Sequence, residues 1–281
     1  MTSLDALARE SGTFAMVAMD QRESLRTMLR EHRHDASDER MRRFKVAVAR
    51  ELAPSASGFL IESDYLGDVA PFVPHGLILA VDALEQEPGA IVEDTALDES
   101  VDVAAAKELG AVALKLLVIW RDDDQRDERV EMSRRFVALA EQHGLLSVLE
   151  PVVRVPDEER EDAIVEAARE LGATRPSLYK CQVPLSGRGE PEEITRHARA
   201  IDAALPVPWV VLSQGVDPAD FPRAVEAACK GGASGMLAGR AVWTSTLPAD
   251  DPTERLRADS ARRLRELCAI VDAHGRPWRE T

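Results

Sequence analysis

The sequence lacks the features of membrane, secreted or nucleic-acid-binding proteins. No apolar run among its 281 residues approaches the roughly 18 residues of a membrane-spanning helix. The N-terminus has no basic region followed by an apolar one, so we expect no secretion signal. Only 3 Cys are present, without CxxC spacing, which favours a cytoplasmic protein without disulfides.

A surplus of basic residues is also missing. The formal net charge is −15, which argues against nucleic acid or an anionic membrane as a partner. A phosphorylated substrate stays compatible with this charge, because a local group of Lys and Arg can dominate the field inside a cleft.

Cofactor and metal motifs are absent as well. The sequence has neither a GxGxxG motif after its first predicted strand nor a GxxxxGK[ST] loop, so we expect no dinucleotide or P-loop site. None of the 6 His falls at the end of a predicted strand, which speaks against a zinc site. We expect no metal and no cofactor.

What the sequence does contain is a regular alternation of strands and helices. The strands are expected at residues 14–20, 58–61, 76–82, 112–119, 145–150, 178–183, 209–213 and 234–239. The helices are expected at 3–10, 24–32, 38–52 (capped by Ser37), near 69–70, 98–109 (capped by Asp98), 127–142, 157–171, 191–204, 218–230 and 253–272, with a loop at 83–96. Eight such units predict a single (β/α)8 barrel domain over residues 1–281, with the active site at the C-terminal ends of the strands.

Four charged residues lie in or at the end of apolar strands: Asp20, Lys115, Glu150 and Lys180. A single buried lysine most often pairs with a carboxylate or extends to solvent. Burying one charge alone would cost several kcal/mol, so four of them indicate one shared polar site. Alternation places Lys180 and Gln182 on one face of their strand, and Cys181 on the other, where we expect a core residue.

This set of residues suits carbonyl chemistry. A neutral Lys180 would attack a ketone, and the protonated imine would accept electrons while a C–C bond breaks. Lys115 is the neighbouring cation that would favour the neutral amine. Glu150 is the candidate for moving protons, and Asp20 would orient a substrate hydroxyl or the amine.

A phosphate site is expected beside these residues. In many barrels the loops after strands seven and eight bind phosphate through backbone N–H groups and an Arg. Ser213 and Gly215 follow the seventh predicted strand, and Gly239 and Arg240 follow the eighth. These glycines are equally compatible with ordinary tight turns.

The motifs then resemble those of one family. Residues 18–26 read AxDQRxSLR, like the opening stretch of the class I aldolases related to tagatose-1,6-bisphosphate aldolase and sulfofructose-1-phosphate aldolase. Five further matches follow in order over nearly the whole chain: 113–120, 149–151, 179–180, 212–216 and 239–243. The resemblance implies a barrel in which Lys180 forms the Schiff base, Glu150 is the acid/base, and Asp20 and Lys115 are catalytic. It also implies phosphate binding by Ser213, Gly215, Gly239 and Arg240, cleavage of a ketose 1-phosphate to dihydroxyacetone phosphate and an aldehyde, and a homo-oligomer.

One position departs from the family pattern. Gln182 stands where relatives commonly have Glu, which removes a negative charge near the Lys180 amine. This change favours a substrate that differs from theirs in its terminal group. The chain length and opening stretch resemble the sulfosugar branch, which favours 6-deoxy-6-sulfofructose 1-phosphate as substrate. Gln21, Arg22 and Gln182 are the candidates for contacting the group on carbon 6.

Three alternatives stay open from the sequence. The first is a tagatose or fructose 1,6-bisphosphate aldolase of the same family. The second is a lyase or isomerase on the same barrel that uses Lys180 as a base without an imine. The third is a non-catalytic sensor of sugar phosphates, which would be favoured by a damaged site.

Overall fold

Eight parallel strands close into a barrel in the computed structural model, which describes residues 2–87 and 90–281. Their order around the barrel is β1-β10-β9-β8-β7-β6-β3-β2. Their bounds are β1 Phe14–Ala18, β2 Gly58–Glu62, β3 Leu77–Ala80, β6 Ala111–Trp120, β7 Leu146–Val153, β8 Leu178–Cys181, β9 Trp209–Val211 and β10 Gly235–Ala238. The predicted barrel is therefore confirmed.

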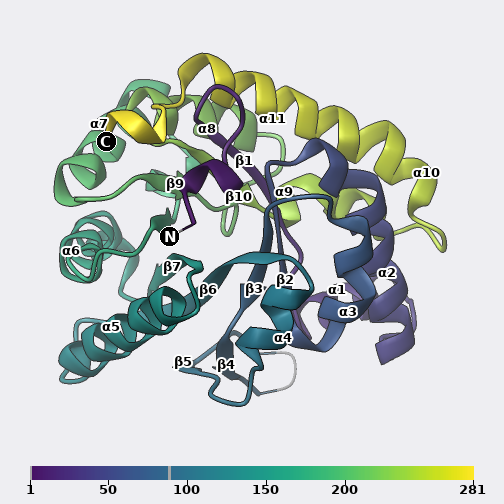
Figure 1. Cartoon of the computed structure of the whole chain (residues 1–281). Coiled ribbons are helices and arrows are strands. Elements are labelled where there is room, and N and C mark those ends of the chain that lie inside the picture. The colour runs from purple at the N-terminus through teal and green to yellow at the C-terminus, as the bar shows by residue number, and fades with distance from the viewer. Residues whose placement is uncertain (1, 88–89) are drawn as a thin grey trace.

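Helices surround the strands (Figure 1). Their bounds are α1 Glu23–Glu31, α2 Asp38–Leu52, α3 Leu66–Val69, α4 Val103–Glu108, α5 Arg126–Gln142, α6 Arg160–Gly172, α7 Pro191–Ala204, α8 Phe221–Lys230, α9 Arg240–Trp243, α10 Thr253–Arg255 and α11 Ala261–His274. In the described part of the chain, no helix is long and apolar enough to cross a membrane.

The core has two main layers, because alternate side chains of each strand point inward or outward. Tyr179 and Cys181 point outward and pack between the strands and the helices, as predicted. Burial raises the pKa of the Cys181 thiol to about 12, which is the behaviour of a core residue rather than a nucleophile. Inward-facing residues such as Met16, Val148 and Leu178 fill the barrel below the charged residues.

One stretch differs clearly from its prediction. The expected loop 83–96 contains an antiparallel hairpin, β4 Asp82–Glu85 and β5 Asp94–Leu97, which projects at the lower edge of Figure 1. The prediction of a loop was wrong because a short polar hairpin carries no apolar alternation. Residues 88–89 of the expected loop lie outside the described residues.

Three element boundaries also need correction. Residues 3–10 form only a 3-10 turn, Leu4–Ala6. Helix α4 begins at Val103 with Asp102 as its cap, because the Asp98 carboxylate accepts from the nearby Ser100 N–H instead. Strand β7 continues through Pro151 to Val153. Since β8 pairs with β7 only at Val148 and Leu149, the missing N–H of Pro151 interrupts no ladder on that side.

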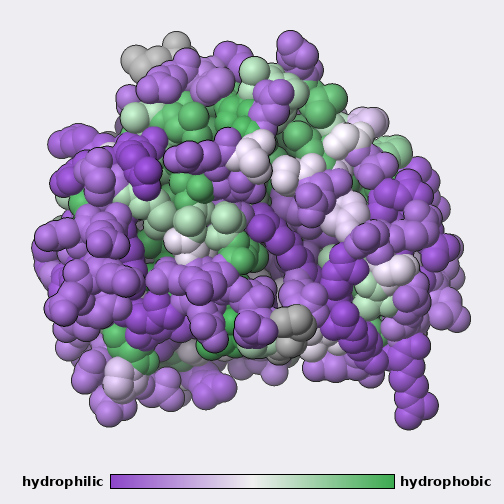
Figure 2. Space-filling view, turned by 90° about the horizontal axis from the view of Figure 1, so that it is seen from below, coloured by the Kyte–Doolittle hydropathy of each residue, from purple (hydrophilic) through white to green (hydrophobic). Residues whose placement is uncertain are grey.

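The surface seen from below is mostly hydrophilic, with hydrophobic residues in separated patches (Figure 2). This agrees with a charged fraction of 30%. The long apolar stretches of the sequence are the strands, and they are buried.

Candidate active site

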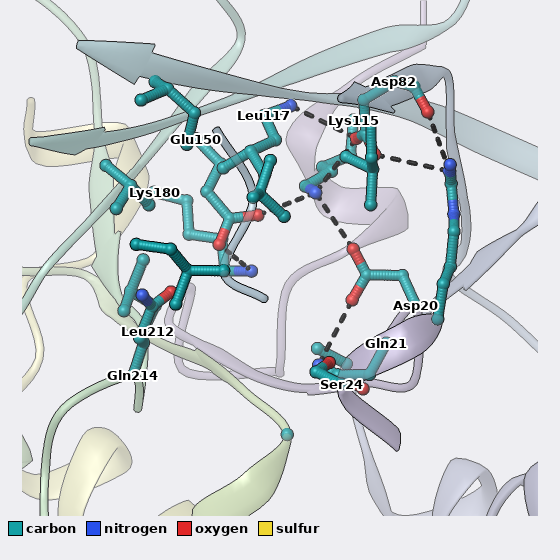
Figure 3. A pocket seen from close by; sticks show the side chains of 18 of the residues that line it. Asp20, Gln21, Ser24, Asp82, Lys115, Leu117, Glu150, Lys180, Leu212 and Gln214 are labelled. Atoms are coloured by element: carbon teal, nitrogen blue, oxygen red, sulfur yellow. Dashed lines mark hydrogen bonds and ion pairs between the residues drawn. The ribbon is translucent and has the colours of Figure 1, made fainter. Parts of the chain in front are cut away.

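The charged side chains predicted from the strand ends meet in one cavity at the C-terminal end of the barrel. Its volume is about 200 Å³, and its lining includes Asp20, Lys115, Glu150 and Lys180. Lys115, Glu150 and Lys180 come from the neighbouring strands β6, β7 and β8, and Asp20 follows β1. The register that places Leu149 beside Tyr179 brings Glu150 beside Lys180 one residue later. Figure 3 shows all four side chains converging.

Lys115 is the centre of a cluster of ion pairs. Its Nζ lies 2.9 Å from Asp20 Oδ2, 3.0 Å from Asp82 Oδ1 and 3.0 Å from Glu150 Oε2. Three carboxylates therefore surround one ammonium group that is only 2% exposed.

Glu150 connects this cluster to Lys180. Its Oε1 lies 2.7 Å from Lys180 Nζ, while its other oxygen contacts Lys115. Lys115 was expected to be the neighbouring cation of Lys180, and that role stays a prediction. In the structure the Glu150 carboxylate lies between the two amines (Figure 3).

Burial and charge shift the pKa values of Lys115 and Asp20 in opposite directions. Burial alone would lower the pKa of Lys115, but Asp20, Asp82 and Glu150 raise this pKa well above its ordinary value. Burial alone would raise the pKa of Asp20, but the ammonium groups of Lys115 and Lys180 hold it well below its usual range. Both shifts favour an ionised Asp20 and a protonated Lys115.

Asp82 is a member of the cluster that the sequence interpretation missed. It is 2% exposed, and its Oδ1 also accepts from the Leu117 N–H at 3.2 Å. Asp82 ends the predicted strand 76–82 just as Asp20 ends 14–20, so the same rule applied to every strand would have included it.

Apolar side chains lie on both sides of these charges. The barrel interior lies below them, and a small cluster of Ile119, Val152 and Leu212 lies above. Exclusion of water strengthens electrostatic interactions in such a place. Among the described residues, no group of three or more His, Cys, Asp or Glu is arranged to hold a metal ion.

Part of the expected phosphate site lines the same cavity. Ser213, Gly239 and Arg240 are in its lining, whereas Gly215 is not. A Cβ on Gly239 would lie 2.6 Å from the Ala18 carbonyl oxygen, so only glycine fits between β10 and β1. Burial lowers the pKa of Arg240, and no described carboxylate forms an ion pair with its guanidinium group.

The three candidates for contacting carbon 6 have different positions. Gln21 and Arg22 line the cavity, and the Arg22 Nη2 donates to the Asp82 carbonyl oxygen at 2.8 Å. Gln182 does not line it, because its Oε1 accepts from the Val153 N–H at 2.8 Å and joins β8 to β7. A direct role of Gln182 in substrate contact is therefore not favoured.

Arg154 is a cavity residue that the sequence interpretation did not include. It follows the end of β7, lines the cavity, and its Nε is buried without a hydrogen-bond acceptor among the described residues. Burial and the nearby Arg121 and Arg240 lower its pKa. The strand was expected to end at residue 150, so Arg154 was not counted among the strand-end residues.

Comparison with known families agrees with this geometry. Residues 14–245 match the model of the DeoC/LacD family aldolases, which covers well over half of the chain. The chain belongs to the DeoC/LacD aldolase family. The resemblance identified from the strand-end motifs is thereby confirmed.

Relatives of this DeoC/LacD aldolase align with it over nearly their whole length. The tagatose 1,6-diphosphate aldolase of Listeria monocytogenes serotype 4a (strain HCC23) is 27% identical, over 98% of this chain and 92% of that protein. The tagatose 1,6-diphosphate aldolase of Staphylococcus aureus (strain JH9) is 25% identical, over 100% of this chain and 97% of that protein.

Solved aldolase structures share the fold. Fructose-bisphosphate aldolase from Plasmodium falciparum superposes with a TM-score of 0.77 at 12% identity, covering 97% of this chain and 93% of that one. An archaeal fructose 1,6-bisphosphate aldolase gives a TM-score of 0.64 at 19% identity, covering 96% and 98%. At these identities the likeness concerns the barrel.

Proposed function

We propose that this protein is a class I aldolase that cleaves 6-deoxy-6-sulfofructose 1-phosphate to dihydroxyacetone phosphate and sulfolactaldehyde, with Lys180 as the Schiff-base residue. The observation that carries the proposal is the 2.7 Å contact between Lys180 Nζ and Glu150 Oε1 on the wall of a cavity with apolar surroundings. A carboxylate at that distance can take a proton from the amine before attack and return it afterwards.

The proposed reaction follows from these positions. The neutral Lys180 amine adds to the C2 ketone, and Glu150 protonates the leaving hydroxyl as the carbinolamine loses water. The C3–C4 bond then breaks and its electron pair moves into the protonated imine, which becomes an enamine. The C4 hydroxyl gives its proton to Glu150 as the aldehyde forms. Protonation at C3 and hydrolysis release dihydroxyacetone phosphate and restore the amine.

Asp20 and Lys115 would orient the substrate. Asp20 is ionised and lines the cavity, so it is suited to accept a hydrogen bond from a substrate hydroxyl. Lys115 already bonds three carboxylates, and in the proposal it holds Asp20 and Glu150 in their orientations.

The arginines support a substrate with an anionic group at each end. Arg240, with Ser213 and Gly239, is proposed to bind the 1-phosphate. Arg154, which follows β7, is proposed to bind the group on carbon 6. Gln21 and Arg22 stay candidates for the same group, although they follow β1, which neighbours β10 in the barrel. Neither Arg154 nor Arg240 forms an ion pair with a carboxylate of the described residues, so both guanidinium groups are available for a ligand.

A second candidate substrate is tagatose 1,6-bisphosphate, because the curated relatives carry that name at 25–27% identity. It requires the same chemistry at carbons 2 to 4 and differs in the group on carbon 6, where a phosphate replaces a sulfonate.

The test is a comparison of three ketoses: the sulfofructose 1-phosphate, tagatose 1,6-bisphosphate and fructose 1,6-bisphosphate. Release of dihydroxyacetone phosphate is followed by a coupled dehydrogenase assay. We expect the highest kcat/KM for the sulfosugar. A bisphosphate preferred by about tenfold or more, equal to 1.4 kcal/mol, would transfer the assignment to the second candidate. Failure to cleave any of the three would favour the imine-free enzyme or the sensor.

A further inference from the structure

Lys45 is a buried cation outside the cavity. It lies on α2, on the outer side of the barrel, and is 0% exposed. Its Nζ donates to the Met19 carbonyl oxygen at 2.7 Å and to the Gln21 carbonyl oxygen at 2.8 Å. These two carbonyl groups flank Asp20 in the chain.

The counter-ion of Lys45 is equally buried. Glu62 ends β2, is 1% exposed, and its Oε1 lies 2.7 Å from Lys45 Nζ. Burial lowers the pKa of Lys45 and raises that of Glu62, and each group opposes the shift of the other. Replacing such a pair by apolar residues is often neutral or stabilising, so a gain in stability does not explain it.

Lys45 donates two hydrogen bonds to a segment without regular secondary structure. Strand β1 ends at Ala18 and α1 begins at Glu23, so the backbone at 19–22 lies outside regular structure. The Met19 N–H donates to the Leu60 carbonyl oxygen, and the Trp243 Nε1 donates to the Ala18 carbonyl oxygen. Lys45 completes the set by binding the carbonyl groups on both sides of Asp20.

We propose that Lys45, with Glu62 as its counter-ion, is a positioning residue of the aldolase site, which fixes the backbone around Asp20 and thereby directs the Asp20 carboxylate at Lys115 and into the cavity. The Asp20 Oδ2 lies 2.9 Å from Lys115 Nζ only while that backbone keeps its path. The effect of Lys45 on catalysis rests on the proposed function; its effect on the position of Asp20 does not.

The test compares Lys45→Met/Glu62→Gln with Glu62→Gln alone. The double variant removes both donors without leaving a buried carboxylate unpaired, whereas the single variant keeps Lys45 and its two carbonyl contacts. A displacement of about 1 Å near the chemistry can cost on the order of 100-fold. We expect a kcat loss of that order in the double variant, a KM change below about threefold, and a clearly smaller kcat loss for Glu62→Gln, which keeps both carbonyl contacts of Lys45.

A crystal structure of the double variant provides a readout that does not depend on turnover. We expect the Asp20–Lys115 contact to be lost or clearly lengthened, and Asp20 to stay in place in Glu62→Gln. If Lys45→Met/Glu62→Gln does not fold, Lys45→Gln/Glu62→Gln replaces it. The side chain of Gln is one bond shorter than that of Lys and cannot reach both carbonyl groups.

Two results would overturn the positioning role: a folded double variant with the kcat of Glu62→Gln, or an unmoved Asp20 in its crystal structure. If the wild-type protein cleaves none of the ketoses, the proposed function fails, and the crystal comparison still decides the role of Lys45.

Discussion

Glu150 contacts Lys180 at 2.7 Å through one carboxylate oxygen and reaches Lys115 at 3.0 Å through the other. One side chain therefore links the proposed nucleophile to the ammonium group of Lys115. Proton transfer at Lys180 and the charge on Lys115 are coupled through this carboxylate, because a proton on either oxygen weakens both contacts.

The first prediction concerns Lys115. Lys115→Met leaves Asp20, Asp82 and Glu150 facing one another, and removal of one partner from a buried charge cluster costs about 3–5 kcal/mol. We expect a lower midpoint of thermal unfolding and a large loss of kcat. A variant as stable as the wild type would contradict the cluster as described.

The loss of stability in Lys115→Met should depend on pH in a definite direction. In the wild type the Asp20 pKa is depressed, so Asp20 contributes stability that is complete above the usual carboxyl range and is lost as pH falls. Without Lys115, we expect the pKa of Asp20 to lie higher. The stability deficit of the variant should therefore grow as pH rises from about 5 to 8, where ordinary carboxyl groups are ionised. Thermal unfolding at both pH values measures it.

The second prediction concerns Arg240. If its guanidinium group binds the 1-phosphate, Arg240→Ala should raise KM for the phosphorylated ketose by about 10- to 100-fold, because charge-assisted hydrogen bonds contribute about 1.5–3 kcal/mol. Arg263→Ala is a matched control, since Arg263 donates to the Ala241 carbonyl oxygen but does not line the cavity. An unchanged KM in Arg240→Ala would move the phosphate site elsewhere.

The third prediction separates the two ends of the substrate. Arg154→Ala should raise KM by about tenfold or more for ketoses with an anionic group on carbon 6, and should leave fructose 1-phosphate nearly unaffected. Arg240→Ala should weaken both kinds of ketose. An equal rise in KM for both kinds of ketose in Arg154→Ala would show that Arg154 does not bind the group on carbon 6.

The fourth prediction concerns Gln182. Its Oε1 bonds the Val153 N–H, so Gln182→Leu should lower the free energy of unfolding by about 1–3 kcal/mol, the cost of an unpaired buried donor. We expect KM to stay within about threefold, because Gln182 does not line the cavity. Steady-state kinetics with the preferred ketose would reveal a substrate contact as a larger rise in KM.

Strand periodicity was sufficient to predict the barrel and the charged residues that it brings together. Asp20, Lys115, Glu150 and Lys180 lie in or after apolar strands, and parallel strands in a closed barrel carry such residues to one end. Asp82 was accessible to the same argument. Arg154 was hidden by a proline that does not end its strand.

The remaining features depend on long-range contacts that periodicity does not encode. Lys45 and Glu62 lie on different elements, and a lysine on an amphipathic helix is ordinarily assigned to solvent. The β4–β5 hairpin has a short polar sequence, although Leu84 and Val92 on it line the cavity. The homo-oligomer and the substrate's group on carbon 6 stay predictions.

Borohydride trapping determines whether Lys180 forms an imine with the substrate. The protein is incubated with dihydroxyacetone phosphate, reduced, digested, and analysed by mass spectrometry, with Lys180→Met and the exposed-site control Lys230→Met in parallel. We expect a covalent adduct on Lys180 in the wild type and in Lys230→Met, and none in Lys180→Met. An adduct on Lys115 would exchange the roles of the two lysines, and binding without any adduct would contradict Schiff-base catalysis.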